Sequence, residues 1–161
     1  MRWESEVRVL VLGGDGFCGW PTSLYLSDRG HEITILDNLS RRKIDVDLEV
    51  GSLTPVVPIG DRIAAWRAVS GREIGFVNVD LATEYDRLAA LLAELRPDAV
   101  VHFAEQRAAP YSMRSQKTKR YTVDNNVRAT HNLLAALVDT GVDAAIAHLG
   151  TMGVYGYGWS G

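Results

Sequence analysis

The stretch V-L-V-L-G-G-D-G-F-C-G-W, Val9 to Trp20, decides the fold. An apolar run ends there at two glycines, and the spacing of Gly13, Gly16 and Gly19 is G-x-x-G-x-x-G. Between a buried strand and a helix, such a bare backbone lets the chain turn sharply, lets a pyrophosphate approach closely and lets the helix pack on the strand. The free N–H groups at the start of that helix then face the phosphates. The stretch predicts a dinucleotide-binding loop, with a glycine-rich turn that only packs as the alternative.

Five short apolar runs recur along the chain, with helical patterns between them. They lack clean polar alternation, which is typical of strands covered on both faces of a parallel sheet. The expected strands are Val7–Leu12, Glu32–Asp37, Ile74–Asp80, Ala99–Ala104 and Ala144–Gly150. This alternation predicts an α/β fold, a Rossmann-type doubly wound parallel sheet with strand order 3-2-1-4-5, in one domain over residues 1–161.

The spacers between these strands predict helices. One apolar stripe consists of Leu88, Leu91, Leu92 and Leu95, at i, i+3, i+4 and i+7, and Pro97 ends it. A second helix is expected over 118–138, with Gly141 as its stop. The segment 38–73 is longer than an ordinary crossover and contains one expected helix, Asp61–Val69, which suggests a functional loop.

Asp37 ends the second expected strand, where a carboxylate can accept hydrogen bonds from the adenosine ribose hydroxyls. It would repel a 2′-phosphate and so favour NAD over NADP. Arg41 and Arg42 could instead pair with that phosphate, but we give Asp37 more weight because the fold fixes its position. Asp80, at the end of the third strand, could bind the adenine amino group or cap the next helix, and the sequence leaves both open.

Composition excludes several classes of protein. A net charge of −3 gives no general reason to expect nucleic acid or an anionic membrane as partner. No apolar run approaches the roughly 18 residues that a membrane span needs, and no signal peptide is evident at the N-terminus. The single cysteine, Cys18, is expected to pack under the glycine loop and fits a cytoplasmic location. No metal site is predicted, and His102 is expected to be a satisfied core histidine.

Seven segments carry a resemblance to a known family. They are GGDGFCGW (13–20), DNLSRR (37–42), SLTP (52–55), DRIAAW (61–66), HFAEQRAAPYSM (102–113), YTVDNNV (121–127) and LGTMGVYG (149–156). Together they resemble the UDP-sulfoquinovose synthase family of sulfolipid biosynthesis. That family lies within the extended short-chain dehydrogenase/reductase, or NAD-dependent epimerase/dehydratase, superfamily. The resemblance implies NAD as cofactor and UDP-glucose and sulfite as substrates. It implies transient oxidation at C4 of the sugar, loss of water across C5–C6, addition of sulfite at C6 and re-reduction at C4.

The resemblance also implies roles for individual residues. The pyrophosphate contacts would be Gly13, Asp15, Gly16, Phe17 and Gly19. The adenosine half of the cofactor would be held by Asp37, Asn38, Leu39, Arg42, Asp80 and Leu81. The nicotinamide half would meet Phe103, Ala104, Glu105 and Arg107. Asn125, on the long helix, would support the cofactor site, and Leu149 would also contact the cofactor. The substrate would meet Gln106, Arg107, Tyr111, Met113 and Thr151.

Thr151 is the implied catalytic residue, because its hydroxyl could donate to or accept from O4 of the sugar as this oxygen changes from alcohol to ketone. For three of these residues, a role without any contact to cofactor or substrate stays open. Arg107 could be a surface charge, Asn125 could only bridge the backbone, and Thr151 could be a turn residue.

The sequence departs from the superfamily pattern in one respect. No tyrosine in these 161 residues has a lysine four positions later, although a Tyr-x-x-x-Lys pair performs acid–base chemistry in the superfamily. We therefore expect an incomplete cofactor-binding domain, without the sixth strand and the substrate domain, that is inactive alone. The alternatives are another NDP-sugar epimerase or dehydratase, or a stand-alone NAD-binding module without catalysis. The resemblance further implies a homodimer through the helix near 118–139.

Overall fold

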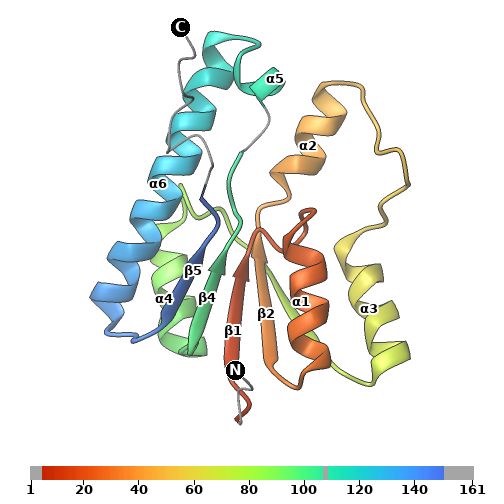
Figure 1. The fold of residues 1–161 in the computed structure, drawn as a ribbon. Coiled ribbons are helices and arrows are strands. Elements are labelled where there is room, and N and C mark those ends of the chain that lie inside the picture. The colour runs from red at the N-terminus through yellow and green to blue at the C-terminus, as the bar shows by residue number, and fades with distance from the viewer. Residues whose placement is uncertain (1–4, 107–108, 151–161) are drawn as a thin grey trace, which may run out of the picture.

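The computed structural model describes residues 5–106 and 109–150. In this part of the chain five parallel strands form one sheet in the order β3-β2-β1-β4-β5. The strands are β1 (Arg8–Leu12), β2 (Glu32–Asp37), β3 (Ile74–Asn78), β4 (Ala99–His102) and β5 (Ala145–His148). The predicted fold class and strand order are confirmed (Figure 1). Four of the five strands are shorter than the apolar runs that predicted them, because the residues beyond their ends turn into loops.

Alternate residues of the central strand β1 feed two hydrophobic cores. Val9 and Val11 belong to the core that is shared with α1 (Gly19–Asp28) and α3 (Ile59–Ser70). Leu10 and Leu12 belong to the core that is shared with α4 (Tyr85–Leu95) and α6 (Gln116–Thr140). Figure 1 shows these helix pairs on opposite faces of the sheet. The sheet is therefore covered on both sides, which explains why its strands lack polar alternation.

The helices differ from expectation mainly in the excursion between β2 and β3. There α2 (Ser40–Asp47) precedes the expected helix, and α3 is longer at both ends than the predicted Asp61–Val69. A further short helix, α5 (Ala109–Ser112), follows β4. The predicted end of α6 is confirmed, since Gly141 takes φ = 63° at its C-cap. Figure 1 shows α2 and α5 on either side of the space above the carboxyl ends of the strands.

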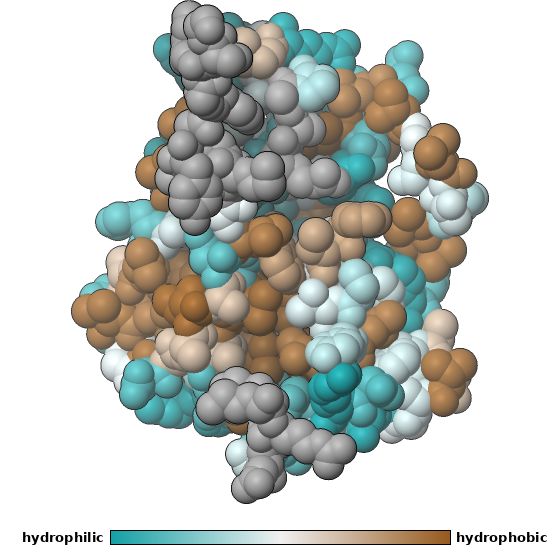
Figure 2. All heavy atoms as spheres, viewed as in Figure 1, coloured by the Kyte–Doolittle hydropathy of each residue, from teal (hydrophilic) through white to brown (hydrophobic). Residues whose placement is uncertain are grey.

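The outer strand β5 leaves apolar surface uncovered. All four of its residues are exposed, including Ile146. On α6 the exposed apolar residues are Val123, Val127, Leu134 and Val138. Figure 2 shows hydrophobic side chains gathered on the side of the molecule that β5 and the adjoining part of α6 form. In the described part of the chain no helix is long and apolar enough to cross a membrane.

Candidate functional site

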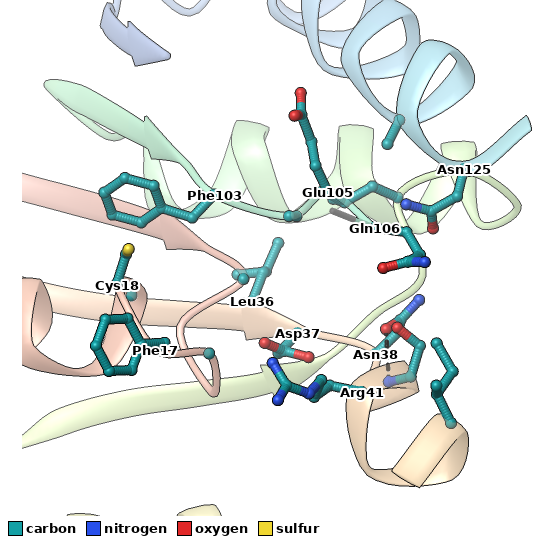
Figure 3. Close-up of a pocket in the computed structure, with 18 of the residues that line it drawn as sticks. Phe17, Cys18, Leu36, Asp37, Asn38, Arg41, Phe103, Glu105, Gln106 and Asn125 are labelled. Atoms are coloured by element: carbon teal, nitrogen blue, oxygen red, sulfur yellow. Dashed lines mark hydrogen bonds between the residues drawn. The ribbon is translucent and has the colours of Figure 1, made fainter. Parts of the chain in front are cut away.

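A cavity of about 340 Å³ lies above the carboxyl ends of the strands. In an open parallel sheet this edge is where ligands bind, beside the point where the chain reverses direction across the sheet, here between β1 and β4. Figure 3 shows Asp37, Asn38 and Arg41 on one side of the cavity and Phe103, Glu105 and Asn125 on the other. The predicted site residues that line it are Gly13, Gly16, Phe17, Gly19, Asp37, Asn38, Leu81, Phe103, Ala104, Glu105, Gln106, Tyr111, Asn125 and Leu149.

The glycine loop forms the floor of this cavity, and its sterics explain its composition. A Cβ on Gly13, where φ is 78°, would lie 2.7 Å from the carbonyl group of Phe103. A Cβ on Gly14 would lie 2.4 Å from a methyl carbon of Ile35. By contrast, a Cβ on Gly16 would meet only the Gly13 carbonyl oxygen, at 3.1 Å. Packing therefore requires glycine at positions 13 and 14. At position 16 the missing side chain instead leaves the backbone open to a ligand in the cavity.

The helix that follows the loop begins without a counter-charge. The N-cap of α1 is Cys18, which makes no side-chain capping hydrogen bond, and the first turn of α1 holds no acidic residue. The positive end of the helix dipole is therefore available to an anion that enters the cavity beside Gly16. Cys18 itself is exposed and lines the cavity, so the expectation that it packs under the loop is wrong. Its backbone takes the N-cap position, which turns its side chain outward.

Asp37 lies at the cavity edge where β2 ends. Its Oδ1 accepts a hydrogen bond from the backbone N–H of Leu39 at 2.7 Å, and its Oδ2 accepts one from the N–H of Asp15 at 2.9 Å. Burial is the main reason why the pKa of Asp37 is raised above its ordinary value, although the two amide hydrogen bonds oppose the shift. The carboxylate is thus held rigidly by the backbone, with lone pairs left for a ligand's hydroxyl groups.

Asp15 and Arg42 do not line the cavity, although both were predicted to bind the cofactor. Asp15 is only 3% exposed, and its carboxylate pairs with Arg42 from α2 and Arg62 from α3. The distance from Arg42 Nε to Asp15 Oδ2 is 2.8 Å. The backbone N–H of Asp15 donates a hydrogen bond to Asp37 Oδ2. These side chains connect the glycine loop to the excursion between β2 and β3, and their binding to a cofactor stays a prediction.

Asp80 and Leu39 contact the residues that form the Asp37 side of the cavity. Asp80 Oδ1 accepts from the N–H of Ala82 at 2.9 Å, and its Oδ2 accepts from Asn38 Nδ2 at 3.0 Å. Neither Asp80 nor Leu39 lines the cavity. The N-cap of α4 is Glu84, so the helix-capping role left open for Asp80 is wrong. Asp80 instead stabilises a turn and orients Asn38, whose side chain does line the cavity.

On the opposite side, the loop after β4 carries Glu105 and Gln106. Glu105 Oε1 lies 2.8 Å from Nε2 of His148 on β5. The main chain of Gln106 is held at both ends by Asn126 of α6, whose Oδ1 accepts from the Gln106 N–H at 2.8 Å. Asn126 Nδ2 donates to the Gln106 carbonyl oxygen at 3.0 Å. Asn125 was predicted from the sequence to support the site, but it is Asn126 that makes these two contacts, while Asn125 lines the cavity.

His102 is the satisfied core histidine that was predicted. It is 1% exposed, its Nδ1 accepts from the N–H of Ala104 at 3.2 Å, and its Nε2 lies 3.1 Å from Thr130 Oγ1. Thr130 donates its own hydroxyl proton to the carbonyl of Asn126, so Nε2 of His102 carries the proton. Burial is the main reason why the pKa of His102 is lowered. His102, Glu105 and His148 lie close enough to hold a metal ion, but His102 has no free lone pair to offer one.

The remaining predictions divide into two groups. Met113 is exposed and does not line the cavity. Arg107 and Thr151 lie outside the described residues, so their predicted roles stay predictions.

Apart from Arg41, sequence reasoning missed one wall of the cavity, which α2 and the residue after it provide. It consists of Ser40, Arg41, Ile44, Asp45 and Leu48. The spacing of Ser40, Ile44 and Leu48, at i, i+4 and i+8, could have predicted a helical face there.

Comparison with known proteins agrees with this geometry. The model of the NAD dependent epimerase/dehydratase family matches residues 9–160. The chain is 44% identical over 149 residues to the chloroplastic UDP-sulfoquinovose synthase of Spinacia oleracea, covering 92% of this chain and 31% of that protein. It is 39% identical over 150 residues to the UDP-sulfoquinovose synthase of Sulfolobus acidocaldarius, covering 93% and 38%. The chain thus spans about a third of the length of these two relatives, and the predicted resemblance is confirmed.

Among solved structures, a UDP-glucose-4-epimerase from Stenotrophomonas maltophila with bound NAD and formylated UDP-arabinopyranose superposes with a TM-score of 0.73. The two chains are 27% identical, and the match covers 96% of this chain and 40% of the epimerase. The described part of this chain is thus similar to a part of a protein that holds a dinucleotide and a sugar nucleotide together.

Proposed function

Because the chain belongs to the NAD dependent epimerase/dehydratase family, we propose that its cavity binds NAD as part of an enzyme that acts on a sugar nucleotide. The observation that carries this proposal is the glycine loop under the cavity. A Cβ on Gly19 would lie 2.2 Å from the Gly13 carbonyl oxygen, so the loop and the start of α1 are as close as backbone allows. The uncapped N-terminus of α1 then offers a site for the pyrophosphate.

The residues around the cavity fit the two halves of NAD. Asp37 would accept hydrogen bonds from the adenosine ribose, with Asn38 and Leu81 beside the adenine. Phe103, Ala104 and Glu105 would meet the nicotinamide half, and Asn125 and Leu149 also line the cavity. Bound there, NAD would supply reversible hydride transfer with the sugar. The protein's part is to orient the two reactants and to keep water away from them.

We further propose that the substrates are UDP-glucose and sulfite and that the product is UDP-sulfoquinovose. Similarity to two synthases of that name supports this choice. Gln106, Tyr111 and Arg107 would bind the sugar nucleotide, and the Thr151 hydroxyl would hydrogen-bond O4 of the sugar during oxidation and re-reduction. Oxidation at C4 would acidify the proton at C5, which permits loss of water across C5–C6 and addition of sulfite at C6.

The test is turnover by purified protein that contains this chain, supplied with NAD, UDP-glucose and sulfite. Mass spectrometry should find a UDP-sugar sulfonate only when sulfite is present. Formation of UDP-galactose without any sulfonate would instead favour the second candidate, a 4-epimerase, which the fold shared with a UDP-glucose-4-epimerase supports. Thr151→Val should abolish turnover and Thr151→Ser should restore part of it, if the hydroxyl group acts as proposed.

The exposed stripe on α6 supports a proposal about assembly. Val123, Val127, Leu134 and Val138 are all at least 49% exposed and recur at intervals of four and seven residues along one helix. Such a stripe suits a homodimer in which two copies of α6 pack together. Sedimentation equilibrium of the wild type and of a Val127→Glu/Val138→Glu variant tests this, since the variant should be monomeric.

A further inference from the structure

Asp15 is a buried residue of the glycine loop and the centre of a charge network. Its Oδ1 accepts a hydrogen bond from Nη2 of Arg62, and its Oδ2 lies 2.8 Å from Nε of Arg42. Arg42 Nη2 also donates to the Asp15 carbonyl oxygen at 3.2 Å. Three elements of the fold thus converge on one residue of the loop, namely α2, α3 and the segment between β1 and α1.

The same network includes Asp37, whose carboxylate would hold the adenosine ribose. Asp37 Oδ2 accepts the N–H of Asp15 at 2.9 Å, while Arg42 binds the carbonyl oxygen of the same residue. Asp37 and Arg42 therefore hydrogen-bond to the N–H and the carbonyl oxygen of Asp15, respectively, and lie close together. Arg42 and Arg62 also interact electrostatically with Asp37. Two carboxylates, of Asp15 and Asp37, thus balance the guanidinium groups of Arg42 and Arg62. They do so beside the proposed adenosine ribose, which carries the additional 2′-phosphate in NADP.

The two arginines are not equally free to move. The Arg62 side chain is 12% exposed, and its guanidinium carbon lies 4.7 Å from the centre of the Trp20 ring, which fixes it in place. The Arg42 side chain is 33% exposed and sits in the first turn of α2, which lines the cavity. If Asp15 did not hold it, the Arg42 guanidinium could turn toward a phosphate bound beside Asp37.

We propose that Asp15 is a specificity-determining residue for the cofactor, because its ion pair with Arg42 withholds that guanidinium from a 2′-phosphate. The inference rests on the proposed NAD site. Asp37 then repels the 2′-phosphate directly, while Asp15 removes the cation that would otherwise attract it. Discrimination against NADP is in this way shared between a residue on the cavity wall and a buried residue of the glycine loop.

Binding of NAD⁺ and NADP⁺ to purified variants, measured by titration calorimetry, tests the proposal. The main variant is Asp15→Asn combined with Arg62→Met, since the second change removes a buried guanidinium that would lose its partner. This pair should shift the ratio of NADP⁺ to NAD⁺ affinity toward NADP⁺ by at least about tenfold. Adding Arg42→Gln should reverse the shift. Asp98→Asn, which breaks a similar ion pair with Arg8 at the other end of the sheet, should leave the ratio unchanged.

The outcomes separate the two claims. If the wild type binds NAD⁺ but the folded Asp15→Asn/Arg62→Met variant keeps the wild-type ratio, the role of Asp15 is refuted. A shift that survives the addition of Arg42→Gln refutes it as well. If the folded wild type binds neither dinucleotide, the proposed NAD site itself fails. Thermal unfolding midpoints, recorded for every variant, establish that each one is folded.

Discussion

Gly19 and Gly13 meet so closely that a Cβ on Gly19 would lie 2.2 Å from the Gly13 carbonyl oxygen and 2.6 Å from the Cα of Gly14. No rotation of a side chain relieves this contact, because both partners are backbone. The start of α1 is thereby pressed against the end of β1. This contact positions the uncapped helix terminus over the cavity floor.

Gly19→Ala should therefore destabilise the fold and disrupt the cavity together. We expect a loss of about 1–3 kcal/mol in the free energy of unfolding, as for other overpacked sites. Urea denaturation measures it, and NAD titration should show weaker binding. Gly60→Ala is the matched control, because a Cβ there meets nothing within 4 Å and its stability should be unchanged or slightly raised. Equal stability of the two variants would contradict the steric argument.

Leu133 and Leu134 are neighbours on α6 with opposite surroundings. Leu133 is 1% exposed in the core that α4 and α6 share, whereas Leu134 is 49% exposed. Leu133→Ala should cost about 2–5 kcal/mol of unfolding free energy. Leu134→Ala should cost less than about 0.5 kcal/mol at concentrations low enough for the chain to be monomeric, and more where the proposed homodimer forms. A large cost at Leu134 in denaturation experiments would mean that a partner covers this face.

His102 makes stability depend on pH. Since burial lowers its pKa in the folded state, the unfolded chain takes up a proton first as the pH falls. The contribution of neutral His102 is fully present above its unfolded pKa of about 6.5 and is lost as the pH falls from there toward the folded pKa. The unfolding midpoint of the wild type should therefore drop between pH 7.5 and pH 5.5, conditions we choose to bracket this window.

The drop should be smaller in His102→Asn, which keeps a hydrogen-bond acceptor near the N–H of Ala104. Replacing the exposed His131 by Asn should leave the pH dependence as in the wild type. The same drop in all three proteins would show that other groups are responsible.

Asn126 positions the loop that carries Glu105 and Gln106. Asn126→Ala removes two hydrogen bonds to the main chain of Gln106, so the loop should no longer be held against α6. At about 1 kcal/mol for each of the two hydrogen bonds, NAD affinity should fall by up to about thirtyfold. Thr140→Ala, which removes a hydrogen bond to Ala136 within the same helix, should leave NAD affinity unchanged. An unchanged affinity in Asn126→Ala would mean that the loop is held by other contacts.

The sequence predicted the sheet and most of the cavity because these rest on local patterns. The glycine spacing, the apolar strands and the position of Asp37 each follow from what a short segment must do in a parallel sheet. Asp15 and Arg42 could not be assigned in this way, because their roles arise from an ion pair between segments 27 residues apart. The wall that α2 forms was missed because only two apolar residues, Ile44 and Leu48, mark its inner face. Asn125 was assigned to the site and lines the cavity, but the role of Asn126 was missed, because two neighbouring asparagines differ only in the direction in which the helix points their side chains.

The central claim is that the cavity above the glycine loop binds NAD, and native mass spectrometry of the purified protein tests it most directly. We predict that added NAD⁺ gives a species heavier by one NAD per chain, which is lost on denaturation. It should be absent from the Gly19→Ala variant at the same concentration and present in the Gly60→Ala variant. A folded wild-type protein that shows no NAD-bound species, even with the dinucleotide in excess, would contradict the account.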